Sequence, residues 1–467
     1  MTSRTAGWRR RTAGFPRIPV TAVRAVLLIA VLGLLGGAFV LLGNAYAPAS
    51  PEPLARRPIP VEPVVDPARP CTREAPPVPA AEPGTPSRAG VSFDPASNTI
   101  VLASGEGVSL SALSSAVGNP AALREVAPGE WLLGADLQVL TGASLQITAP
   151  DVRWLKLGSS PAGFVTVKVL GGALDITGTC VTSWDTAAGH ADADSLDGRA
   201  FLLARDGARM LIQHSELRYL GYGEVESYGM SWRTAATGGI TTSVVSHLFY
   251  GLYSFRVDGL TVQDNEFHHN ELYGIDPHTS SRRMLIERNL VHNNGKHGIV
   301  LAEDCTDSVI RDNVVYANDH HGIVLYLHSD RNIVEGNDSF GNAAQGININ
   351  ESAGNTVRGN RVYDNTESGI AVGQTAKDNV VENNQIRGNQ QDGIRLVSDA
   401  VETTVRGNVI GENTRYGVYV DGNGTFDLAG NTIFGNRTGV MLKGTPTVVT
   451  PADNRLFDNV KGDIAKS

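Results

Sequence analysis

The chain has few cysteines and lacks the sequence patterns of several large protein classes. Its 467 residues include three cysteines, Cys71, Cys180 and Cys305, so at most one disulfide can form and no zinc pattern is present. We expect all three to be small packing residues. No nucleotide-binding or Rossmann pattern occurs, and no GGxGxD calcium repeat. We therefore expect no cofactor and no metal.

Positive charge is also scarce outside the first seventy residues. Residues 1–70 hold nine arginines and three acids, a net charge of +6, so the −9 of the whole chain leaves −15 (−9 minus +6) on residues 71–467. An acidic body argues against nucleic acid as a partner, because phosphate binding requires a basic surface. A polyanionic substrate would need a local basic groove.

Only one apolar run is long enough to span a bilayer, at residues 25–42 (AVLLIAVLGLLGGAFVLL). Six arginines precede it, which favours a cytoplasmic N-terminus. We expect a basic cytoplasmic segment at 1–24, a transmembrane signal-anchor at 25–43 and a Pro/Ala-rich linker at 44–90. Cleavage after Ala47 is the alternative, although Pro48 disfavours it. The predicted location is the cell membrane, single-pass, with the body extracytoplasmic, or secreted if the signal is cleaved.

From residue 265 onward, two asparagine columns and one glycine column recur about every 24 residues. The unit is N-x-[VILF]-x-x-N-x-x-x-G-[IV]-x-[VIL], as in NLVHNNGKHGIVL at 289–301. The repeat glycines run from Gly251 to Gly439 at spacings of 22 to 24 residues. Short apolar alternations broken by Asn and Gly predict short strands and tight turns rather than helices.

This period predicts an all-β chain, a parallel β-helix solenoid over residues 91–467. The coils would stack at roughly 4.8 Å, with the first and third residues after each repeat glycine pointing inward. We expect the asparagines to form stacked amide ladders with a structural role. Residues Ser109–Val117 predict a short amphipathic helix that caps the open end.

One coil departs from the repeat, at YGIDPH (Tyr273–His278). The positions two and four residues after Gly274 face outward, so Asp276 and His278 share one face of one strand. Pro277 cannot donate a hydrogen bond to the ladder and predicts a distorted stretch.

Neighbouring coils bring further charged and aromatic residues to the same face. Any one of them alone would be an ordinary surface side chain, but their coincidence in adjacent coils favours a functional surface. These residues are Arg256, Lys296, His297, Glu303, His320 and His321.

The odd coil resembles the Tyr-Gly-[Phe/Ile]-Asp-Pro-His-[Asp/Glu] motif of the bacterial mannuronan C5-epimerases, which modify alginate. Thr279 stands where the acid usually follows, and KHGIV (296–300) and NDHHGI (318–323) resemble the next coils of that family. The likeness spans roughly residues 130–440. It implies a right-handed parallel β-helix, epimerase activity without a cofactor, and catalytic roles for His278 and Tyr273 with Asp276 in support.

Epimerisation at C5 of a uronate removes a proton next to a carboxylate and returns one to the opposite face. This needs a neutralised carboxylate and a base and an acid on opposite sides of the ring. We assign His278 as the base, Tyr273 as the acid, and Asp276 as a group that orients His278 or the sugar. Arg256, with Lys296 as the next candidate, would neutralise the carboxylate. The remaining substrate-binding candidates are His297, His320, His321 and Glu303.

Three alternatives remain open from the residues alone. A polysaccharide lyase shares the proton abstraction but then expels the 4-linked sugar by β-elimination. A glycoside hydrolase would need two carboxylates, for which Asp276 and Glu303 are the candidates. A surface protein would bind the polysaccharide without changing it. In each case we expect an anionic polysaccharide, a polyuronate, as partner and a monomeric chain.

Overall fold

The structure is a computed structural model that describes residues 52–61, 66–71, 89–397, 400–449 and 453–467. The chain divides into two units, Met1–Pro53 and Leu54–Ser467, and the second unit carries the fold. Within the described ranges, none of the helices combines the length and the apolar content that crossing a membrane requires. The predicted anchor at 25–43 lies outside the described residues.

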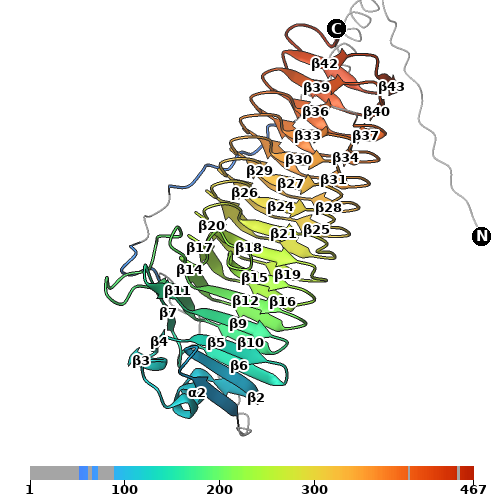
Figure 1. Cartoon of the computed structure of the whole chain (residues 1–467). Helices are drawn as coiled ribbons and strands as arrows, with labels where there is room; N and C mark the ends of the chain where they lie inside the picture. The colour runs from blue at the N-terminus through green and yellow to red at the C-terminus, as the bar shows by residue number, and fades with distance from the viewer. Residues whose placement is uncertain (1–51, 62–65, 72–88, 398–399, 450–452) are drawn as a thin grey trace, which may run out of the picture. The chain divides into compact units, whose positions relative to one another are not determined.

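The second unit is a β-solenoid in which each coil contributes strands to three faces (Figure 1). Face A contains β1 (Gly90–Asp94), β2 (Thr99–Ser109), β5 (Asp136–Leu140), β9 (Thr166–Leu170), β12 (Phe201–Arg205), β15 (Gly229–Arg233), β18 (Tyr250–Phe255), β21 (Ile275–His278), β24 (Ile299–Ala302), β27 (Ile323–Tyr326), β30 (Ile347–Asn350), β33 (Ile370–Gly373), β36 (Ile394–Val397), β39 (Tyr416–Asp421), β42 (Thr438–Lys443) and β45 (Ile464–Lys466).

Face B follows face A along the chain. It contains β6 (Ala143–Thr148), β10 (Ala173–Thr177), β13 (Arg209–Gln213), β16 (Thr237–Thr241), β19 (Thr261–Gln263), β22 (Leu285–Glu287), β25 (Val309–Arg311), β28 (Ile333–Glu335), β31 (Thr356–Arg358), β34 (Val380–Glu382), β37 (Thr403–Arg406), β40 (Thr425–Ala429) and β43 (Thr447–Val449), and the end of β2 pairs with β6.

Face C completes each coil. It contains β3 (Leu123–Ala127), β4 (Glu130–Leu133), β7 (Trp154–Ser160), β8 (Gly163–Phe164), β11 (Cys180–Trp184), β14 (Glu216–Arg218), β17 (Val244–Ser246), β20 (Glu266–His268), β23 (Leu290–His292), β26 (Val314–Tyr316), β29 (Asp338–Phe340), β32 (Arg361–Tyr363), β35 (Gln385–Arg387), β38 (Val409–Gly411), β41 (Thr432–Phe434) and β44 (Arg455–Phe457). Pairing between successive coils is parallel on all three faces.

The core lies inside the coils, as the period-2 pattern predicts. In β24 and β27, Ile299 pairs with Ile323 and Leu301 with Leu325, and all four side chains are fully buried. Such in-register stacking lets each coil bury its apolar residues against the coils before and after it, which a single coil could not do alone. The repeat glycines are needed for the same close packing. A Cβ on Gly298 would meet Val315 Cγ1 at 2.5 Å and the carbonyl oxygen of Gly322 at 2.7 Å.

The asparagine columns form the predicted amide ladders. The side-chain amide of Asn289 donates to Asn313 Oδ1 (3.0 Å), and that of Asn313 donates to Asn337 Oδ1 (2.9 Å). These buried amides also satisfy backbone groups, since Asn313 Nδ2 donates to the carbonyl of Ile286 (3.0 Å). A third, shorter ladder was not predicted, and its members are Asn332, Asn355 and Asn379.

One end of the solenoid is covered by α2 (Leu110–Val117), the predicted capping helix. Ser109 is its N-cap, and its hydroxyl accepts a hydrogen bond from the Ala112 amide (3.2 Å), as N-cap side chains commonly do. Leu110 and Leu113 are buried in the core, so the helix shields the apolar interior of the first coils from water.

Two segments, residues 54–61 and 66–71, form a strap that lies against face C. Leu54 packs against a stack of Tyr316, Phe340 and Tyr363, and Arg57 Nε donates to Asp338 Oδ2 (2.7 Å). Residues 66–71 continue along this face. The cysteine expectation is correct for the buried Cys305 and wrong for the other two, because the strap brings Cys71 to Cys180 and they form a disulfide.

Candidate functional site

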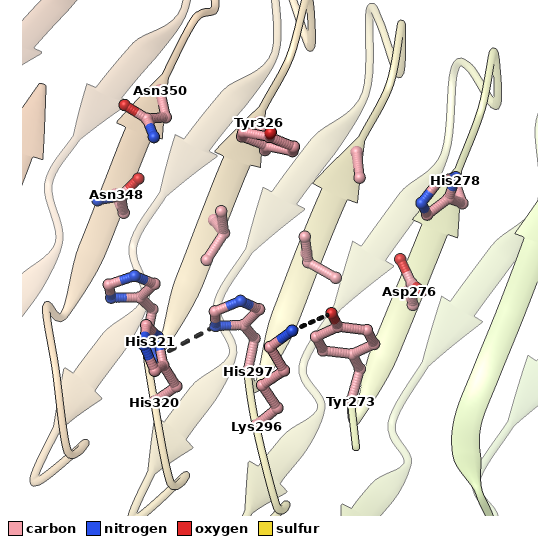
Figure 2. A pocket seen from close by; sticks show the side chains of 13 residues that line it. Tyr273, Asp276, His278, Lys296, His297, His320, His321, Tyr326, Asn348 and Asn350 are labelled. Carbon is pink, nitrogen blue, oxygen red and sulfur yellow. Dashed lines mark hydrogen bonds between the residues drawn. The ribbon is translucent and has the colours of Figure 1, made fainter. Parts of the chain in front are cut away.

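A pocket of about 380 Å³ opens on face A over β21, β24, β27 and β30, and this volume falls within the range of small-ligand sites. Figure 2 shows its side chains. The lining residues are Tyr273, Asp276, His278, Lys296, His297, Val300, Ala302, His320, His321, Val324, Tyr326, Asn348 and Asn350.

Strand β21 supplies the residues at one end of the pocket. His278 pairs with Phe255 of the preceding coil and with Ala302 of the next. Between β21 and β24 only the first and last residues of β21, Ile275 and His278, have partners. Pro277 explains this gap, because it has no N–H to contribute to the ladder. The next residue, Thr279, has a positive φ of 30°, which ends the strand and turns the chain to face B.

His278 is joined to an acid through Thr279. Its Nδ1 lies 2.8 Å from Thr279 Oγ1, and that hydroxyl donates to Glu303 Oε2 (2.8 Å). Burial lowers the pKa of His278 below its ordinary value. Glu303 opposes this effect and Arg233 adds to it.

Tyr273 lies just before β21, at the opposite end of that strand from His278 (Figure 2). Its ring stacks between Tyr250 (ring centroids 5.1 Å apart) and His297 (5.3 Å apart), and its hydroxyl accepts a hydrogen bond from Lys296 Nζ at 2.8 Å (Figure 2). The stack continues to His321, whose ring lies 5.0 Å from that of His297 and nearly parallel to it. Tyr273 is therefore held by its neighbours on both faces.

Asp276 forms the floor between His278 and Tyr273 (Figure 2). It is 1% exposed, and neither carboxylate oxygen has a hydrogen-bond partner among the described residues. Burial raises its pKa well above the usual range, with Lys296 opposing and Glu303 reinforcing the shift. Such a carboxyl tends to hold a proton at neutral pH, and it can then donate a hydrogen bond to a bound group.

The tautomers of two pocket histidines follow from backbone hydrogen bonds. The amide of His321 donates to His297 Nδ1 (3.3 Å), and the amide of Gln345 donates to His321 Nδ1 (3.1 Å). In a neutral imidazole whose Nδ1 accepts, the hydrogen is on Nε2. Burial lowers the pKa of His297 to about 2 and that of His321 to about 3, so both rings stay neutral. Each ring therefore offers an N–H donor at Nε2.

The position of the hydrogen on Nε2 of His297 and His321 affects whether this histidine cluster can bind a metal ion. His297, His320 and His321 have ring nitrogens within 4.8 Å of one another, which by distance alone suits a metal ion. A ligating imidazole needs a lone pair toward the metal, and it usually donates its other N–H to an acceptor. In His297 and His321 the nitrogen with the lone pair already accepts a backbone N–H. The cluster therefore fits an anion or a hydroxyl better than a cation.

Of the nine residues predicted for the site, seven line the pocket: Tyr273, Asp276, His278, Lys296, His297, His320 and His321. Arg256 and Glu303 do not. Arg256 has a left-handed backbone (φ 52°) just after β18, and its guanidinium lies over the Phe255 ring, 4.9 Å from the centroid. Glu303 Oε2 lies 3.6 Å from His278 Nδ1 and is joined to it by the Thr279 hydroxyl, behind the pocket lining.

Three residues at the far end of the pocket were not predicted from the sequence: Tyr326, Asn348 and Asn350. All three occupy the outward positions, two or four residues after Gly322 or Gly346, that identified Asp276 and His278. The same rule applied to later coils would therefore have found them. Val300, Ala302 and Val324 also follow it, and they form a small apolar patch with Tyr273.

Curated relatives match part of the chain. The mannuronan C5-epimerase AlgG of Azotobacter vinelandii is 30% identical over 181 residues, which is 35% of this chain and 33% of that protein. The mannuronan C5-epimerase of Pseudomonas putida is 32% identical over 179 residues, 35% of this chain and 34% of that protein. The chain thus spans about a third of the length of these relatives.

Solved structures and a family model match a larger part. The crystal structure of the periplasmic alginate epimerase AlgG has a TM-score of 0.61 at 24% identity, covering 79% of this chain and 85% of that one, and a point variant of it has a TM-score of 0.64. At this identity the likeness concerns the fold. The family model described as right handed beta helix region matches residues 202–343 and 325–456, more than half of the chain. The chain therefore belongs to the right-handed β-helix family.

Proposed function

We propose that the chain is an extracytoplasmic enzyme that epimerises uronate residues in a polymer at C5. The observation that carries this proposal is the arrangement of His278 and Tyr273 on two sides of the buried Asp276 carboxyl in one pocket. The partial likeness to mannuronan C5-epimerases supports a polyuronate such as alginate as the substrate.

The substrate carboxylate must be neutralised before its neighbouring C5–H becomes acidic. Lys296 and Asp276 are suited to this step, because one is a cation and the other is a buried carboxyl with a raised pKa. A protonated Asp276 would donate a hydrogen bond to the substrate, and the negative charge would move onto the enediolate oxygens near Lys296. Arg256, the first candidate from the sequence, does not line the pocket, and its guanidinium lies over the Phe255 ring instead.

His278 is suited to act as the base because its hydrogen is fixed on Nδ1. The Thr279 hydroxyl has one hydrogen, and it is given to Glu303, so Thr279 must accept from His278 Nδ1–H. The Nε2 of His278 then carries a lone pair. As the C5–H bond breaks, that lone pair takes the proton and the electrons of the bond pass into the enediolate.

Tyr273 is suited to return a proton from the opposite side. Because Lys296 Nζ already donates to the Tyr273 oxygen, the phenolic hydrogen is free to point at the substrate. The Tyr273 O–H bond breaks as the new C5–H bond forms, and Lys296 stabilises the phenolate until solvent reprotonates it. His297 and His321 would donate Nε2–H to hydroxyl or carboxylate oxygens of adjoining sugars, with His320 beside them.

The extracytoplasmic location rests on separate observations. A disulfide such as Cys71–Cys180 forms and persists in oxidising compartments. The apolar run at 25–42 would export the body whether it is retained as an anchor or cleaved.

Two variants and a matched control test the assignment. Polymannuronate incubated with the parent chain should gain guluronate, measured by proton NMR, while the His278→Ala and Tyr273→Phe variants should lose at least about a hundredfold in rate. His190→Ala removes an exposed histidine that does not line the pocket and should leave the rate unchanged. A folded His278→Ala variant with full activity would exclude His278 as the base. Unsaturated chain ends, which absorb in the ultraviolet, would instead indicate a lyase.

A further inference from the structure

The C-terminal coils carry a second group of cationic and aromatic residues in the same columns as the pocket. Five successive backbone hydrogen bonds link Lys296 to Arg415, through His320, Ala344, Glu367 and Gln391, one residue per coil. At the spacing of stacked strands, the two residues lie about 24 Å apart along face A. Arg415 thus repeats the cation of the pocket at a later coil.

Two further columns, that is, sets of residues at equivalent positions in successive coils, also run from the pocket to this group. Tyr416 lies in the column of Tyr273, His297 and His321, since each residue of that column accepts a hydrogen bond from the glycine of the preceding coil. Arg395 lies in the column of Asn348, two strands further on, by way of Ala371. These residues therefore face outward on the side of the solenoid where the pocket opens.

The group is compact. The Arg395 guanidinium carbon lies 4.6 Å from the Tyr419 ring centroid, and that of Arg415 lies 5.1 Å from the Tyr416 ring centroid. The two tyrosine rings are stacked, with centroids 5.4 Å apart. Arginines over aromatic rings keep a fixed orientation while their outer N–H groups stay available, which suits recognition of carboxylates.

The carboxylate of Asp392 forms ion pairs with both arginines. It is fully buried, with Oδ2 3.0 Å from Arg395 Nη1 and Oδ1 3.6 Å from Arg415 Nε. The side chains of Arg395 and Arg415 remain 29% and 39% exposed. One buried carboxylate shared by two guanidiniums leaves a net positive charge at the surface, in a body whose overall charge is strongly negative. The nearby pair Lys443 and Asp421 adds no net charge.

Strand β33 lies between the pocket and this group. Its outward positions include Ala371 and Gly373, which leave room for a chain lying along the face. Glu367 precedes β33, and its carboxylate accepts a hydrogen bond from Gln345 Nε2. A polymer bound in the pocket can therefore continue over β33 toward Arg395.

We propose that Arg395, Arg415 and Tyr416 form a distal subsite that binds the carboxylate of a uronate several sugars away from the one in the pocket. This rests on the proposed function, because it takes the same polyuronate as ligand. Binding at two separated points of one chain raises the affinity for long polymers through effective concentration and leaves short oligomers unaffected.

Binding measurements on an inactive full-length chain test this subsite without any turnover. In a His278→Ala background, calorimetry would compare polymannuronate with a mannuronate trisaccharide. The Arg395→Gln/Arg415→Gln variant should bind the polymer about tenfold more weakly, with trisaccharide binding unchanged. The control is Arg406→Gln, which removes an exposed arginine of face B from the same region.

The outcomes separate this proposal from the proposed function. Polymer affinity that is unchanged in the double variant would overturn the distal subsite, even if the parent chain epimerises polymannuronate. A weakened polymer affinity would support the subsite, even if the parent shows no epimerisation. An equal loss of polymer and trisaccharide binding would also overturn it, because the arginines would then be acting on the pocket itself.

Discussion

At the scale of single residues, the histidines of the pocket differ in where their hydrogen lies. His278 faces a hydroxyl whose hydrogen goes to Glu303, so its Nδ1 must donate. His297 and His321 accept backbone amides at Nδ1, so their hydrogen is on Nε2. The same side chain thus presents a lone pair at the catalytic coil and N–H donors along the neighbouring coils.

Thr279 is a positioning residue, because its hydroxyl fixes the tautomer of His278. Removing that hydroxyl tests this role. Thr279→Val keeps the β-branched shape and loses the hydroxyl that joins His278 Nδ1 to Glu303 Oε2, two atoms 3.6 Å apart. We expect kcat to fall about tenfold to hundredfold, because a larger share of His278 would adopt the tautomer without a lone pair on Nε2.

Thr279→Ser is the matched control, since it keeps the hydroxyl and should retain most of the activity. Nitrogen-15 NMR of the imidazole would report the His278 tautomer directly in each variant. If Thr279→Val were as active as Thr279→Ser with an unchanged tautomer, the link would have no role.

The pH dependence of kcat/KM follows from the lowered pKa of His278. Burial and the nearby Arg233 disfavour the imidazolium, and Glu303 only partly offsets them. The base therefore stays neutral as the pH falls below 6.5, the ordinary histidine value, and is lost only when the pH reaches the lower pKa. We expect the acidic limb of the kcat/KM profile below pH 6.5. A limb at or above 6.5 would contradict His278 as the base in this environment.

Much of the site could be predicted from residues because the repeat fixes which positions face outward. Asp276, His278 and the column of Tyr273 follow from the glycine register alone. Arg256 lies outside the pocket lining because the alternation ends with β18, and its own left-handed backbone turns its side chain over the Phe255 ring. The contact of Glu303 with Thr279 depends on side-chain rotamers, which the register does not specify.

At the scale of elements, the asparagine ladders join the coils. Asn337 is fully buried, donates to the Ile310 carbonyl and Asn360 Oδ1, and accepts from Asn313. We expect Asn337→Ala to lower the free energy of unfolding by about 2–4 kcal/mol, because it leaves buried polar groups without partners. Denaturant unfolding measures this.

The control for the ladder is Gln385→Ala, at an exposed position on β35. It should change stability by less than about 0.5 kcal/mol. Equal effects of the two substitutions would mean that the ladder amides contribute no more than a surface amide.

The strands and ladders were predictable because a repeated pattern reinforces each assignment. The short third ladder at Asn332, Asn355 and Asn379 was not predicted, because serine or threonine takes its place in adjacent coils. The strap was not predicted either, since the Pro-rich composition of residues 54–61 indicates only an extended chain and not the aromatic stack on which it lies.

At the scale of the whole molecule, the Cys71–Cys180 disulfide closes a long loop between the strap and face C. The two cysteines are 109 residues apart, and a loop of this size stabilises the folded chain by about 5 kcal/mol in the chain-entropy account. We expect a reducing agent to lower the melting temperature of the parent chain. The Cys71→Ser/Cys180→Ser variant should melt at the lower temperature with or without reductant. A parent chain that is insensitive to reductant would contradict the stabilising role.

The central claim is that a proton leaves C5 of a polymeric uronate and another returns to the opposite face. The most direct measurement is proton NMR of polymannuronate incubated with the full chain in heavy water. We predict guluronate signals that grow with time and carry deuterium at C5. Unsaturated chain ends without guluronate, or an unchanged spectrum, would contradict it.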